Sequence, residues 1–413
     1  MKWETAKLGD YIDILSGYAF KSRDFIDNGI PVIKIKNITP PNVSLDDLSF
    51  VSDETAEKAH KYLLNYNDIL IALTGSHINQ MASVVGRVAR VKYNQPSLLN
   101  QRVGKIIAND NSKCDIDYVY YYLSQDDIKI KLATKAGGAA NQANISPSDV
   151  KALDIPFPEY DTQKMISSIL LSYDALVENN QKQIKLLEEA AQRLYKEWFV
   201  DLRFPGHETT SIVNGIPEGW KESTFLDVCS KINAGGTPSR RKSEYWKNPS
   251  IKWFKTGELF DEWLIDSEEM ISEEGLFNSS AKLFPKNTIA MAIYASPTLG
   301  RMGIFESTSA CNQAMLCMLA DERKVTWQWL FFKLYENREK FNAIANGAGQ
   351  QNISSDTVKN TAIILPPKQI IDLFTNQVKA TFDKRLILQK QIKSLIEARD
   401  RLLQKLMSGE IEV

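Results

Sequence analysis

The chain has 413 residues, of which 43% are apolar and 10% aromatic, a composition that indicates roughly two to four folded domains and excludes a disordered protein. Its 50 basic and 51 acidic residues leave a formal net charge of −1, so bulk charge does not predict nucleic-acid binding. No run of about 18 apolar residues occurs, which argues against a membrane span, and the first residues lack the apolar core of a signal peptide. We therefore expect a cytoplasmic protein with no membrane partner.

Residues 1–158 are predicted to form one α+β domain. Short aliphatic runs at residues 31–35 and 68–73 are bounded by Gly, Pro and Asn, which is typical of strands. One helical run is expected at residues 118–132, and a loop rich in Gly, Ala, Asn and Gln follows at 137–142. The prolines within residues 155–158 break regular structure and mark the end of the domain.

Residues 159–210 contain a long amphipathic helical pattern. Apolar side chains recur at spacings of three and four, and neither Gly nor Pro interrupts residues 162–199. At about 1.5 Å per residue this stretch would be about 57 Å long, which is more than one small domain requires. The narrow stripe predicts a coiled-coil seam that includes Ile184, Leu187 and Leu194, with Asn180 on the same stripe.

Residues 211–367 repeat the plan of residues 1–158. The order along the chain is therefore globule, helix, globule, helix, which indicates a tandem duplication and a molecule with two-fold pseudo-symmetry. Four of the matched segments are Ser16-Gly17 with Ala234-Gly235, Asn67-Asp68-Ile69 with Asn287-Thr288-Ile289, Asn100-Gln101 with Asn312-Gln313, and Asn144-Ile145-Ser146 with Asn352-Ile353-Ser354.

Residues 368–413 contain the second long helical pattern, and part of it copies the first. The segment Gln181-Lys182-Gln183-Ile184-Lys185 recurs as Gln389-Lys390-Gln391-Ile392-Lys393, an offset of 208 residues (389 minus 181). The predicted seam continues through Ile392, Leu395 and Leu402, with Arg399 on the stripe. Asn180 and Arg399 could set the register of a helix pair. Two separate surface helices, each packed on its own domain, would also show polar residues at these positions.

The two helical segments carry opposite net charges. Residues 159–210 have 6 basic and 9 acidic side chains, net −3, whereas residues 368–413 have 9 and 6, net +3. The globular segments are balanced, with 18 and 18 in residues 1–158 and 17 and 18 in residues 211–367. These charges suit the helices to pair with each other. DNA binding would need local basic patches or help from a partner.

Motifs for catalysis and cofactor binding are absent. The sequence has no Walker-type phosphate loop, no G-x-G-x-x-G after a strand and no G-x-S-x-G nucleophile elbow. The four cysteines form no C-x-x-C pair, so we expect buried thiols in a reducing compartment rather than a zinc site. We therefore expect no enzymatic activity, no metal and no cofactor in this chain. The cysteines are Cys114, Cys229, Cys311 and Cys317.

Several loops mix cationic, amide and aromatic side chains, which can contact phosphates or read purine edges. The candidate DNA-binding residues of the first globule are Lys21, Arg23, Thr74, Ser76, His77, Asn79, Gln80, Arg87, Asn141 and Gln142. Those of the second globule are Ser239, Arg240, Arg241, Lys242, Tyr245, Trp246, Tyr294, Ser296, Arg301, Gln350 and Gln351. Each charged loop could equally be a solvated face, and each Gly/Gln loop could be a helix C-cap and turn. Their recurrence at similar points of the repeat favours a binding role.

Over essentially its whole length the chain resembles the specificity subunits of type I restriction-modification systems. The resemblance rests on the order of two globules and two helices, on the paired Gly/Gln loops and on the Pro-ended exits of both globules. Three local segments add to it: Gly17-Tyr18-Ala19-Phe20-Lys21, Gly235-Gly236-Thr237-Pro238-Ser239 and the C-terminal run at residues 401–409.

The resemblance implies a division into target-recognition domain 1 (1–158), a first spacer helix (159–210), target-recognition domain 2 (211–367) and a second spacer helix (368–413). Each recognition domain would read one half of a bipartite site on double-stranded DNA. The helices would pack as an antiparallel coiled coil, space the domains and dock two modification subunits. S-adenosylmethionine, ATP and Mg would belong to the modification and restriction subunits. The residues alone also allow a coiled-coil scaffold whose globules bind proteins or glycans and not DNA.

Overall fold

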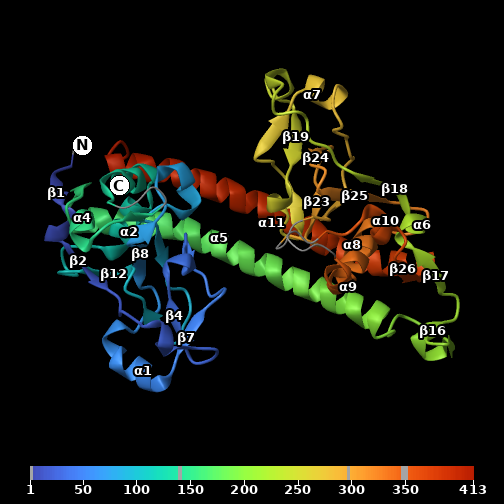
Figure 1. Ribbon diagram of the computed structural model, residues 1–413, viewed down its shortest axis with the longest axis horizontal. Helices are drawn as coiled ribbons and strands as arrows, with labels where there is room; N and C mark the ends of the chain where they lie inside the picture. The colour runs from blue at the N-terminus through green and yellow to red at the C-terminus, as the bar shows by residue number, and fades with distance from the viewer. Residues whose placement is uncertain (1–2, 138–141, 295–297, 346–351) are drawn as a thin grey trace. The chain divides into compact units, whose positions relative to one another are not determined.

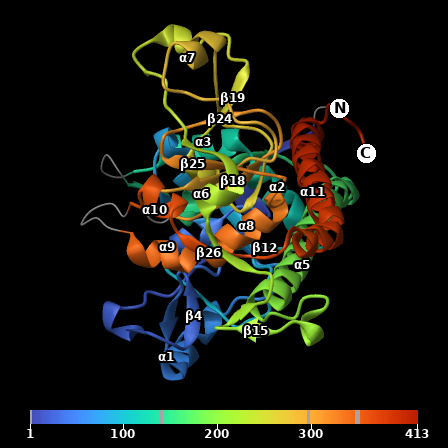
Figure 2. The same ribbon diagram turned by 90° about the vertical axis from the view of Figure 1, so that its right-hand side faces the viewer.

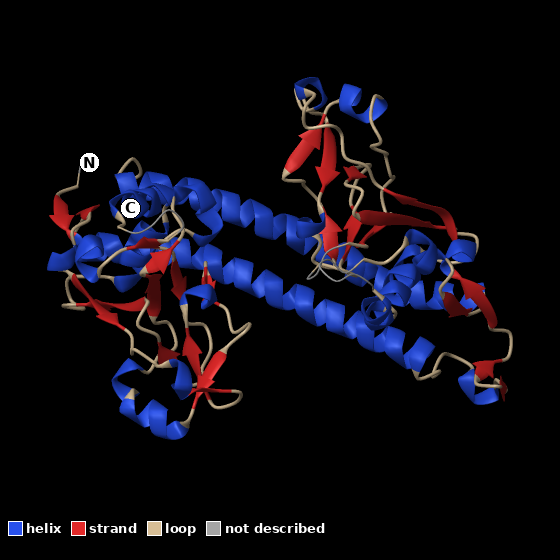
Figure 3. Cartoon of the chain, in the orientation of Figure 1, coloured by secondary structure: helices blue, strands red, loops and turns tan. Residues whose placement is uncertain are grey.

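The computed structural model describes residues 3–137, 142–294, 298–345 and 352–413. The chain divides into two compact units. Unit 1 comprises Met1–Leu176 and Leu395–Val413, and unit 2 comprises Val177–Ser394. Each unit mixes helices and strands, so the predicted α+β class is confirmed (Figure 3).

Unit 1 contains two main sheets. One has six strands in the order β2-β12-β8-β10-β6-β5, and the other has four in the order β11-β4-β7-β3. Two short antiparallel pairs, β1–β14 and β9–β13, complete the strands. The strands are β1 Thr5–Lys7, β2 Ile12–Ser16, β3 Phe25–Ile26, β4 Ile30–Ile33, β5 Ile38–Thr39, β6 Asn42–Val43, β7 Ser49–Val51, β8 Ile69–Ala72, β9 Thr74–Gly75, β10 Val88–Arg90, β11 Leu98–Leu99, β12 Val103–Ala108, β13 Ala143–Asn144 and β14 Asp154–Pro156. The shorter helices are α1 Asp53–Lys58, α2 Ile116–Ser124, α3 Asp126–Lys135 and α4 Pro147–Lys151.

The alternation of side chains along β8 divides the core of unit 1 into layers. Ile69 and Ile71 pack with the helical layer that includes Tyr118 of α2. Leu70 and Ala72 face the other way and pack with residues of β4 and β11. In Figure 1 the four-stranded sheet and α1 accordingly lie on the side of β8 and β12 away from α5. Because β8 is buried on both faces, residues 69–73 appear in the sequence as a continuous apolar run.

Unit 2 is built on the same plan. A five-stranded sheet runs β18-β25-β22-β23-β20 and a three-stranded sheet runs β21-β19-β24. The strands are β15 Ile212–Val213, β16 Ile216–Pro217, β17 Lys221–Thr224, β18 Cys229–Ala234, β19 Ile251–Phe254, β20 Glu262–Leu264, β21 Glu269–Ile271, β22 Ile289–Ala292, β23 Met302–Phe305, β24 Ala310–Cys311, β25 Met315–Ala320 and β26 Ala362–Leu365. The shorter helices are α6 Phe225–Val228, α7 Glu273–Phe277, α8 Trp327–Glu336, α9 Arg338–Ile344 and α10 Ser355–Lys359.

The duplication predicted from the sequence is confirmed by the sheet topology. The order β2-β12-β8-β10-β6 in the large sheet of unit 1 corresponds to the order β18-β25-β22-β23-β20 in unit 2. The pairs β10–β6 and β23–β20, at corresponding places, are both parallel. The small sheets also share one parallel pair, β11–β4 in unit 1 and β24–β19 in unit 2. Figure 2 shows β19, β24 and α7 of unit 2 on the side of β25 and β18 away from α8, as β4 and α1 are placed in unit 1.

The segments that match between the two halves have local structural reasons. Asn67 and Asn287 both adopt left-handed backbone angles, with φ of 69° and 66°, at the turn before a central strand. Asn tolerates this conformation better than most residues. Ser146 and Ser354 are the N-caps of α4 and α10, and their side chains accept hydrogen bonds from backbone N–H groups of the first turn.

Two local predictions for unit 1 are wrong. The single helix expected at residues 118–132 is two helices, because Gln125 has extended angles (φ −67°, ψ 141°) between α2 and α3. Asp126 and Asp127 at the start of α3 favour this second helix N-terminus. The prolines within residues 155–158 were predicted to break regular structure, but β14 continues to Pro156 and pairs with β1 as an edge strand.

Two long helices, α5 Tyr160–Tyr195 and α11 Lys368–Ser408, each contribute residues to both units. A π-helical turn, Lys196–Val200, continues α5. In unit 1, Ile166 of α5 shares a hydrophobic core with Leu403 and Leu406 of α11. Further along α5, Asp174 forms an ion pair with Arg399 at 2.6 Å.

The same antiparallel direction is found within unit 2. Asn180 donates a hydrogen bond from Nδ2 to Oε1 of Gln391 at 3.4 Å, and Glu188 forms an ion pair with Arg385 at 3.5 Å. As the residue number rises along α5, the number of its partner falls along α11, so the helices run antiparallel. The predicted antiparallel coiled coil is confirmed.

No helix among the described residues is long and apolar enough to cross a membrane. The described residues also contain no group of three or more His, Cys, Asp or Glu side chains placed to bind a metal ion. Cys114, Cys311 and Cys317 are buried and Cys229 is partly buried. Burial raises the pKa of Cys114 and Cys229 to about 12, which keeps both thiols protonated at neutral pH.

Candidate functional site

A pair of polar loops meets in unit 1 beside the end of β8. The loop after β8 forms β9, and the chain that follows the Gly/Gln loop forms β13, which pairs antiparallel with β9. Thr74 strengthens this pairing, because its Oγ1 donates to Oδ1 of Asn144 at 2.8 Å. The pairing brings the loop that follows Thr74 near Gln142, which directly precedes β13 and is exposed. Asn141 lies outside the described residues.

The loop after β9 is shaped by its own hydrogen bonds. Ser76 is only 9% exposed, and its Oγ donates to the carbonyl oxygen of Gln80 at 2.7 Å. The 3₁₀ segment Ile78–Ser83 follows and leaves Asn79 and Gln80 exposed, with His77 half-buried at its N-cap. The backbone is therefore fixed while amide side chains point to solvent, an arrangement suited to hydrogen bonding with a ligand surface.

Arg87 and Arg90, also near this loop, are turned toward the protein. Arg87 donates from Nη1 to the carbonyl of Ala82 at 2.8 Å, and burial lowers the pKa of its guanidinium. Arg90 is 4% exposed and packs over the ring of Tyr120 with 4.0 Å from guanidinium carbon to ring centroid. Both arginines therefore brace the β8–β10 region.

Unit 2 places corresponding loops together. Tyr294, which follows β22, forms an isolated antiparallel bridge with Asn352, which follows the second Gly/Gln loop. Tyr294 is 38% exposed. Arg301, which directly precedes β23, lies over the exposed ring of Phe260 with 5.9 Å from the guanidinium carbon to the ring centroid. Ser296, Gln350 and Gln351 lie outside the described residues.

A second polar loop of unit 2 surrounds the 3₁₀ segment Ser243–Tyr245. The guanidinium of Arg240 stacks on Trp246 at 3.7 Å from its ring centroid and forms an ion pair with Glu269. The Nε1 of Trp246 donates to the carbonyl of Ser239 at 3.2 Å. Arg240 and Trp246 thereby stiffen the loop. Arg241 is exposed on the same loop and forms no ion pair with another described residue.

Lys242 and Tyr245, in the same loop, are joined by a side-chain hydrogen bond. Tyr245 is 3% exposed, and its hydroxyl donates to the carbonyl of Asn278 at 2.9 Å while it accepts from Nζ of Lys242 at 2.8 Å. The hydrogen bond to Tyr245 raises the pKa of Lys242, which stays charged.

In unit 1, Lys21 and Arg23 are both exposed at the 3₁₀ segment Ser22–Asp24.

The glycines of the matched segments are required by close backbone approach. A Cβ on Gly17 would lie 2.3 Å from the carbonyl oxygen of Leu99, and one on Gly235 would lie 2.3 Å from that of Asn312. Contacts of this length with backbone are not tolerated, so only Gly fits at either position.

The structure thus sorts the candidate residues into exposed and internal groups. Thr74, Ser76 and Tyr245 are buried and hydrogen-bonded within the protein. Arg87 is half-buried and donates to the carbonyl of Ala82, whereas Arg240 is exposed but stacks on Trp246 and pairs with Glu269. These contacts give all five residues a part in holding the loops, and their contact with DNA stays a prediction. Exposure could not be deduced from residue type, and Phe260, 63% exposed beside Arg301, was missed because a lone apolar residue in a polar loop gives no signal. The candidates with exposed or partly exposed side chains are Lys21, Arg23, His77, Asn79, Gln80, Arg87, Gln142, Ser239, Arg240, Arg241, Lys242, Trp246, Tyr294 and Arg301.

The predicted seam residues lie at or near the helix contacts. Ile184 is 6% exposed. Leu187, Ile392 and Leu395 are half-buried. Leu194 packs on the main core of unit 2, and Leu402 packs on that of unit 1. The two polar residues of the stripe each contact the opposite helix: Asn180 donates to Gln391, and Arg399 forms an ion pair with Asp174.

Comparison with known proteins gives consistent matches along the whole chain. A model of the type I restriction modification DNA specificity domain matches residues 1–189 and 217–412. The type I restriction enzyme MjaIX specificity subunit of Methanocaldococcus jannaschii is 27% identical over 422 residues, covering 100% of this chain and 94% of the relative. The StySPI specificity subunit of Salmonella potsdam is 21% identical over 420 residues, covering 98% and 88%. A crystal structure of the S subunit of a type I system from M. genitalium shares the fold, with a TM-score of 0.59 at 16% identity over 98% of this chain and 96% of that chain.

Proposed function

The chain belongs to the type I restriction-modification DNA specificity family, and from this premise we propose that it is the sequence-specific DNA-binding subunit of such a complex. Each globule reads one half of a bipartite site on double-stranded DNA. The long helices set the spacing of the half-sites and dock two modification subunits, and restriction subunits join the complex. The chain itself is non-catalytic. The alternative of a scaffold with no DNA role is not supported by the family.

The observation that carries this proposal is the recurrence of one loop arrangement on two copies of one fold. In both units a loop that leaves a central strand pairs with the segment after a Gly/Gln loop, through Thr74 and Asn144 in unit 1 and through Tyr294 and Asn352 in unit 2. A duplicated surface on diverged copies suits two half-sites of different sequence. It has no evident use in a protein that reads one continuous site.

We propose that the exposed side chains of these loops contact DNA. Asn79, Gln80 and Gln142 of unit 1 carry amides that suit hydrogen bonds to adenine edges, and Arg241 and Lys242 of unit 2 suit phosphates. Thr74, Ser76 and Tyr245 support the loops from inside. The near-neutral net charge of −1 is consistent with partner subunits supplying much of the phosphate neutralisation.

Chemistry on the DNA belongs to the partners in this proposal. S-adenosylmethionine would bind the modification subunits, and ATP and Mg the restriction subunits. This chain contributes the choice of sequence and the placement of the partners on it. Loss of an exposed loop residue is accordingly expected to change where methylation occurs or how tightly DNA binds, and not the chemical step itself.

Selection from random-sequence duplex with the reconstituted modification complex tests the proposal. We expect enrichment of two short specific sequences separated by a fixed gap. A heptad inserted into both helices, after Asn180 in α5 and after Lys390 in α11, adds about 10 Å and should lengthen the gap by about three base pairs. A single uninterrupted site would contradict the proposed function, and an unchanged gap in the lengthened variant would contradict the spacer role.

A further inference from the structure

One large apolar side chain of unit 2 is exposed at the end of the sheet that carries the polar loops. Phe260 lies two residues before β20 and is 63% exposed. Strand β20 runs parallel to β23, and β22 runs antiparallel to β23, so the start of β20, the start of β23 and the end of β22 meet. Phe260, Arg301 and Tyr294 therefore lie at the same end of the sheet.

Several contacts hold the backbone on both sides of Phe260. Leu259 is fully buried, and Asp261 has a left-handed φ of 63°, which is uncommon in residues other than Gly. The guanidinium of Arg338 donates to both carboxylate oxygens of Asp261, with 2.9 Å from Nη1 to Oδ2. The N–H of Asp261 donates to the carbonyl of Met302 at 2.8 Å, and the N–H of Met302 donates back to Oδ1 of Asp261 at 2.9 Å. The exposed ring thus projects from a fixed backbone, which reduces the entropy lost when it meets a ligand.

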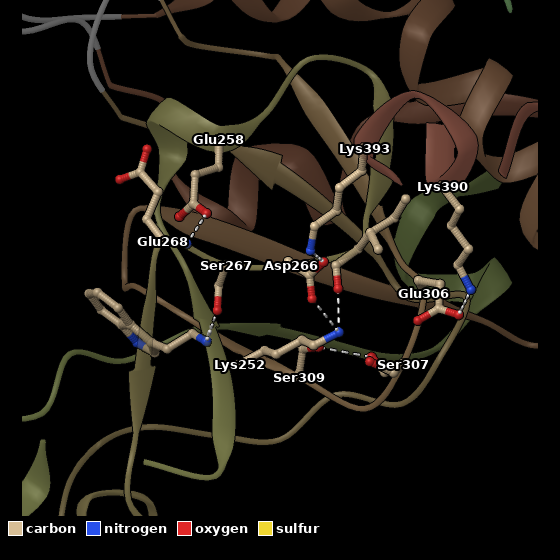
Figure 4. Close-up of polar contacts among 12 residues, drawn as sticks. Lys252, Glu258, Asp266, Ser267, Glu268, Glu306, Ser307, Ser309, Lys390 and Lys393 are labelled. Carbon is tan, nitrogen blue, oxygen red and sulfur yellow. Dashed lines mark hydrogen bonds and ion pairs between the residues drawn. The ribbon is translucent and has the colours of Figure 1, made fainter. Parts of the chain in front are cut away.

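The acidic residues nearest to this ring in the sequence are engaged within the unit. Glu258 accepts hydrogen bonds from two backbone N–H groups, at 2.7 Å and 2.9 Å, and Figure 4 shows the second, from Glu268. Asp261 is paired with a guanidinium, and Oε2 of Glu262 accepts from Nε2 of Gln389 at 2.6 Å. Because these carboxylates have partners inside the unit, they repel a DNA phosphate less than open carboxylates would.

Arg301 lies over one face of the Phe260 ring. Its cation suits a phosphate, while the ring edge and the opposite face remain for a base. Insertion between two stacked base pairs would need both faces of the ring, so the stacked guanidinium disfavours an intercalating role. The arrangement instead suits contact with a group at the edge of a base pair.

Phenylalanine has no hydrogen-bonding group, so it distinguishes base pairs by apolar contact. The apolar group that a base pair presents in the major groove is the C5-methyl of thymine. We infer that Phe260 reads a thymine in the half-site of unit 2 through this methyl group. The inference rests on the proposed function and adds to it one residue and the base that this residue selects.

Unit 1 is built differently at the corresponding place. Arg87 corresponds to Arg301, because each directly precedes its strand and its carbonyl accepts a hydrogen bond of 2.9 Å from the last residue of the central strand. Residues 34–41, which precede β6, contain no aromatic side chain at all, whereas Phe260 precedes β20. The thymine contact is therefore expected in one half-site only, and the other half-site is an internal control.

Removal of the thymine methyl group tests the inference. The half-site of unit 2 is the one that persists when residues 1–158 are exchanged. Each of its thymines is replaced singly by uracil, which keeps the hydrogen-bonding groups and lacks the methyl. The Kd of the reconstituted modification complex for each duplex is measured by fluorescence anisotropy at fixed salt. For the wild type we expect one replacement to weaken binding about fourfold, the effect of burying one methyl group.

The variant Phe260→Ala should bind the thymine and uracil duplexes equally, and the thymine duplex at least about fourfold more weakly than the wild type does. Phe260→Leu keeps an apolar side chain and should retain part of the preference. Phe277 of α7 is 77% exposed in the same unit, so Phe277→Ala is the matched control and should keep the full preference. All variants should keep the wild-type Tm, and uracil in the half-site of unit 1 should affect every protein alike.

Other outcomes separate the inference from the proposed function. If no bipartite site is selected, both fail. If a bipartite site is selected but its unit 2 half contains no thymine, or no uracil replacement weakens wild-type binding, the inference alone fails. A Phe260→Ala complex that still prefers thymine overturns it as well. If that complex also loses its modification subunit on sedimentation, the ring belongs to a protein interface instead.

Discussion

Asp174 and Arg399, which are 225 positions apart in the sequence, form an ion pair of 2.6 Å between α5 and α11 within unit 1. Both side chains are less than a fifth exposed. The hydroxyl of Tyr121 in α2 donates to the second carboxylate oxygen of Asp174 at 2.5 Å. The pair therefore fixes one register between the two helices and ties that register to the recognition domain.

Removal of the cation should leave Asp174 as a partly buried, unpaired carboxylate. We expect Arg399→Met to lower the free energy of unfolding by about 2 kcal/mol, since breaking a buried pair costs more than replacing it whole. The double variant Asp174→Asn/Arg399→Met retains an acceptor for Tyr121 and should recover most of that loss. Urea unfolding of the four proteins gives the coupling energy, and a coupling near zero would show that the pair does not specify the register.

The ion pairs of α11 in unit 2 should make stability depend on pH in the acid range. The hydrogen bond from Lys393 lowers the pKa of Asp266, and that from Lys390 lowers the pKa of Glu306. A carboxyl whose folded-state pKa is lowered stabilises the fold above its ordinary value near about 4, and this contribution is lost as pH falls through the lowered value.

The variant Lys390→Met/Lys393→Met removes both pairs. We expect its Tm to lie below that of the wild type at pH 7, with the difference shrinking as pH falls from about 5 to about 3. Thermal unfolding followed by circular dichroism measures the difference. A gap that stayed constant down to pH 3 would mean that the lysines act by packing rather than by charge.

The close approach at Gly235 predicts a large effect from one methyl group. A Cβ there would lie 2.3 Å from two backbone carbonyl oxygens, so Gly235→Ala should cost about 3 kcal/mol. Gly257 in the same unit has no atom within 4 Å of its added Cβ, and Gly257→Ala is the matched control, expected to change stability by less than about 1 kcal/mol. Equal effects of the two substitutions would contradict the assigned role of Gly235.

Arg240 and Arg241 are adjacent but should respond differently. Arg241 is exposed, so Arg241→Ala should weaken DNA binding by the assembled complex about equally for all sequences and reduce the salt slope by about 1. Arg240 is stacked on Trp246 and paired with Glu269, so the main expected effect of Arg240→Ala is a lower Tm of the chain. Lys340→Ala, an exposed lysine of α9, is the control. Loss of specificity at one base pair in Arg241→Ala would instead identify a base contact.

The sequence predicted the architecture well because the duplication left strong local signals. Identical segments in α5 and α11, the Ser caps of α4 and α10 and the Asn residues at left-handed turns are each fixed by short-range physics. The strand–strand order and the packing of α2 on the sheet depend on long-range contacts, which no local pattern contains. The break at Gln125 between α2 and α3 was missed because neither Gly nor Pro marks it.

The candidate site was predicted only in outline. Residue type located the polar loops, but it could not show that Arg240 stacks on Trp246 and pairs with Glu269, whereas the likewise exposed Arg241 forms no ion pair with another described residue. Tyr245 was expected at the surface and is buried, because its hydroxyl finds a partner in the carbonyl of Asn278. Such sorting depends on tertiary packing around each side chain.

The exchange of one recognition domain tests the central claim most directly. Residues 1–158 are replaced by the corresponding domain of another specificity subunit, and the methylated sequences in the host genome are mapped by long-read sequencing. We expect one half of the bipartite site to change while the other half and the gap stay the same. A change in both halves, or a methylated sequence identical to that of the wild type, would contradict the account of two independent readers on one spacer.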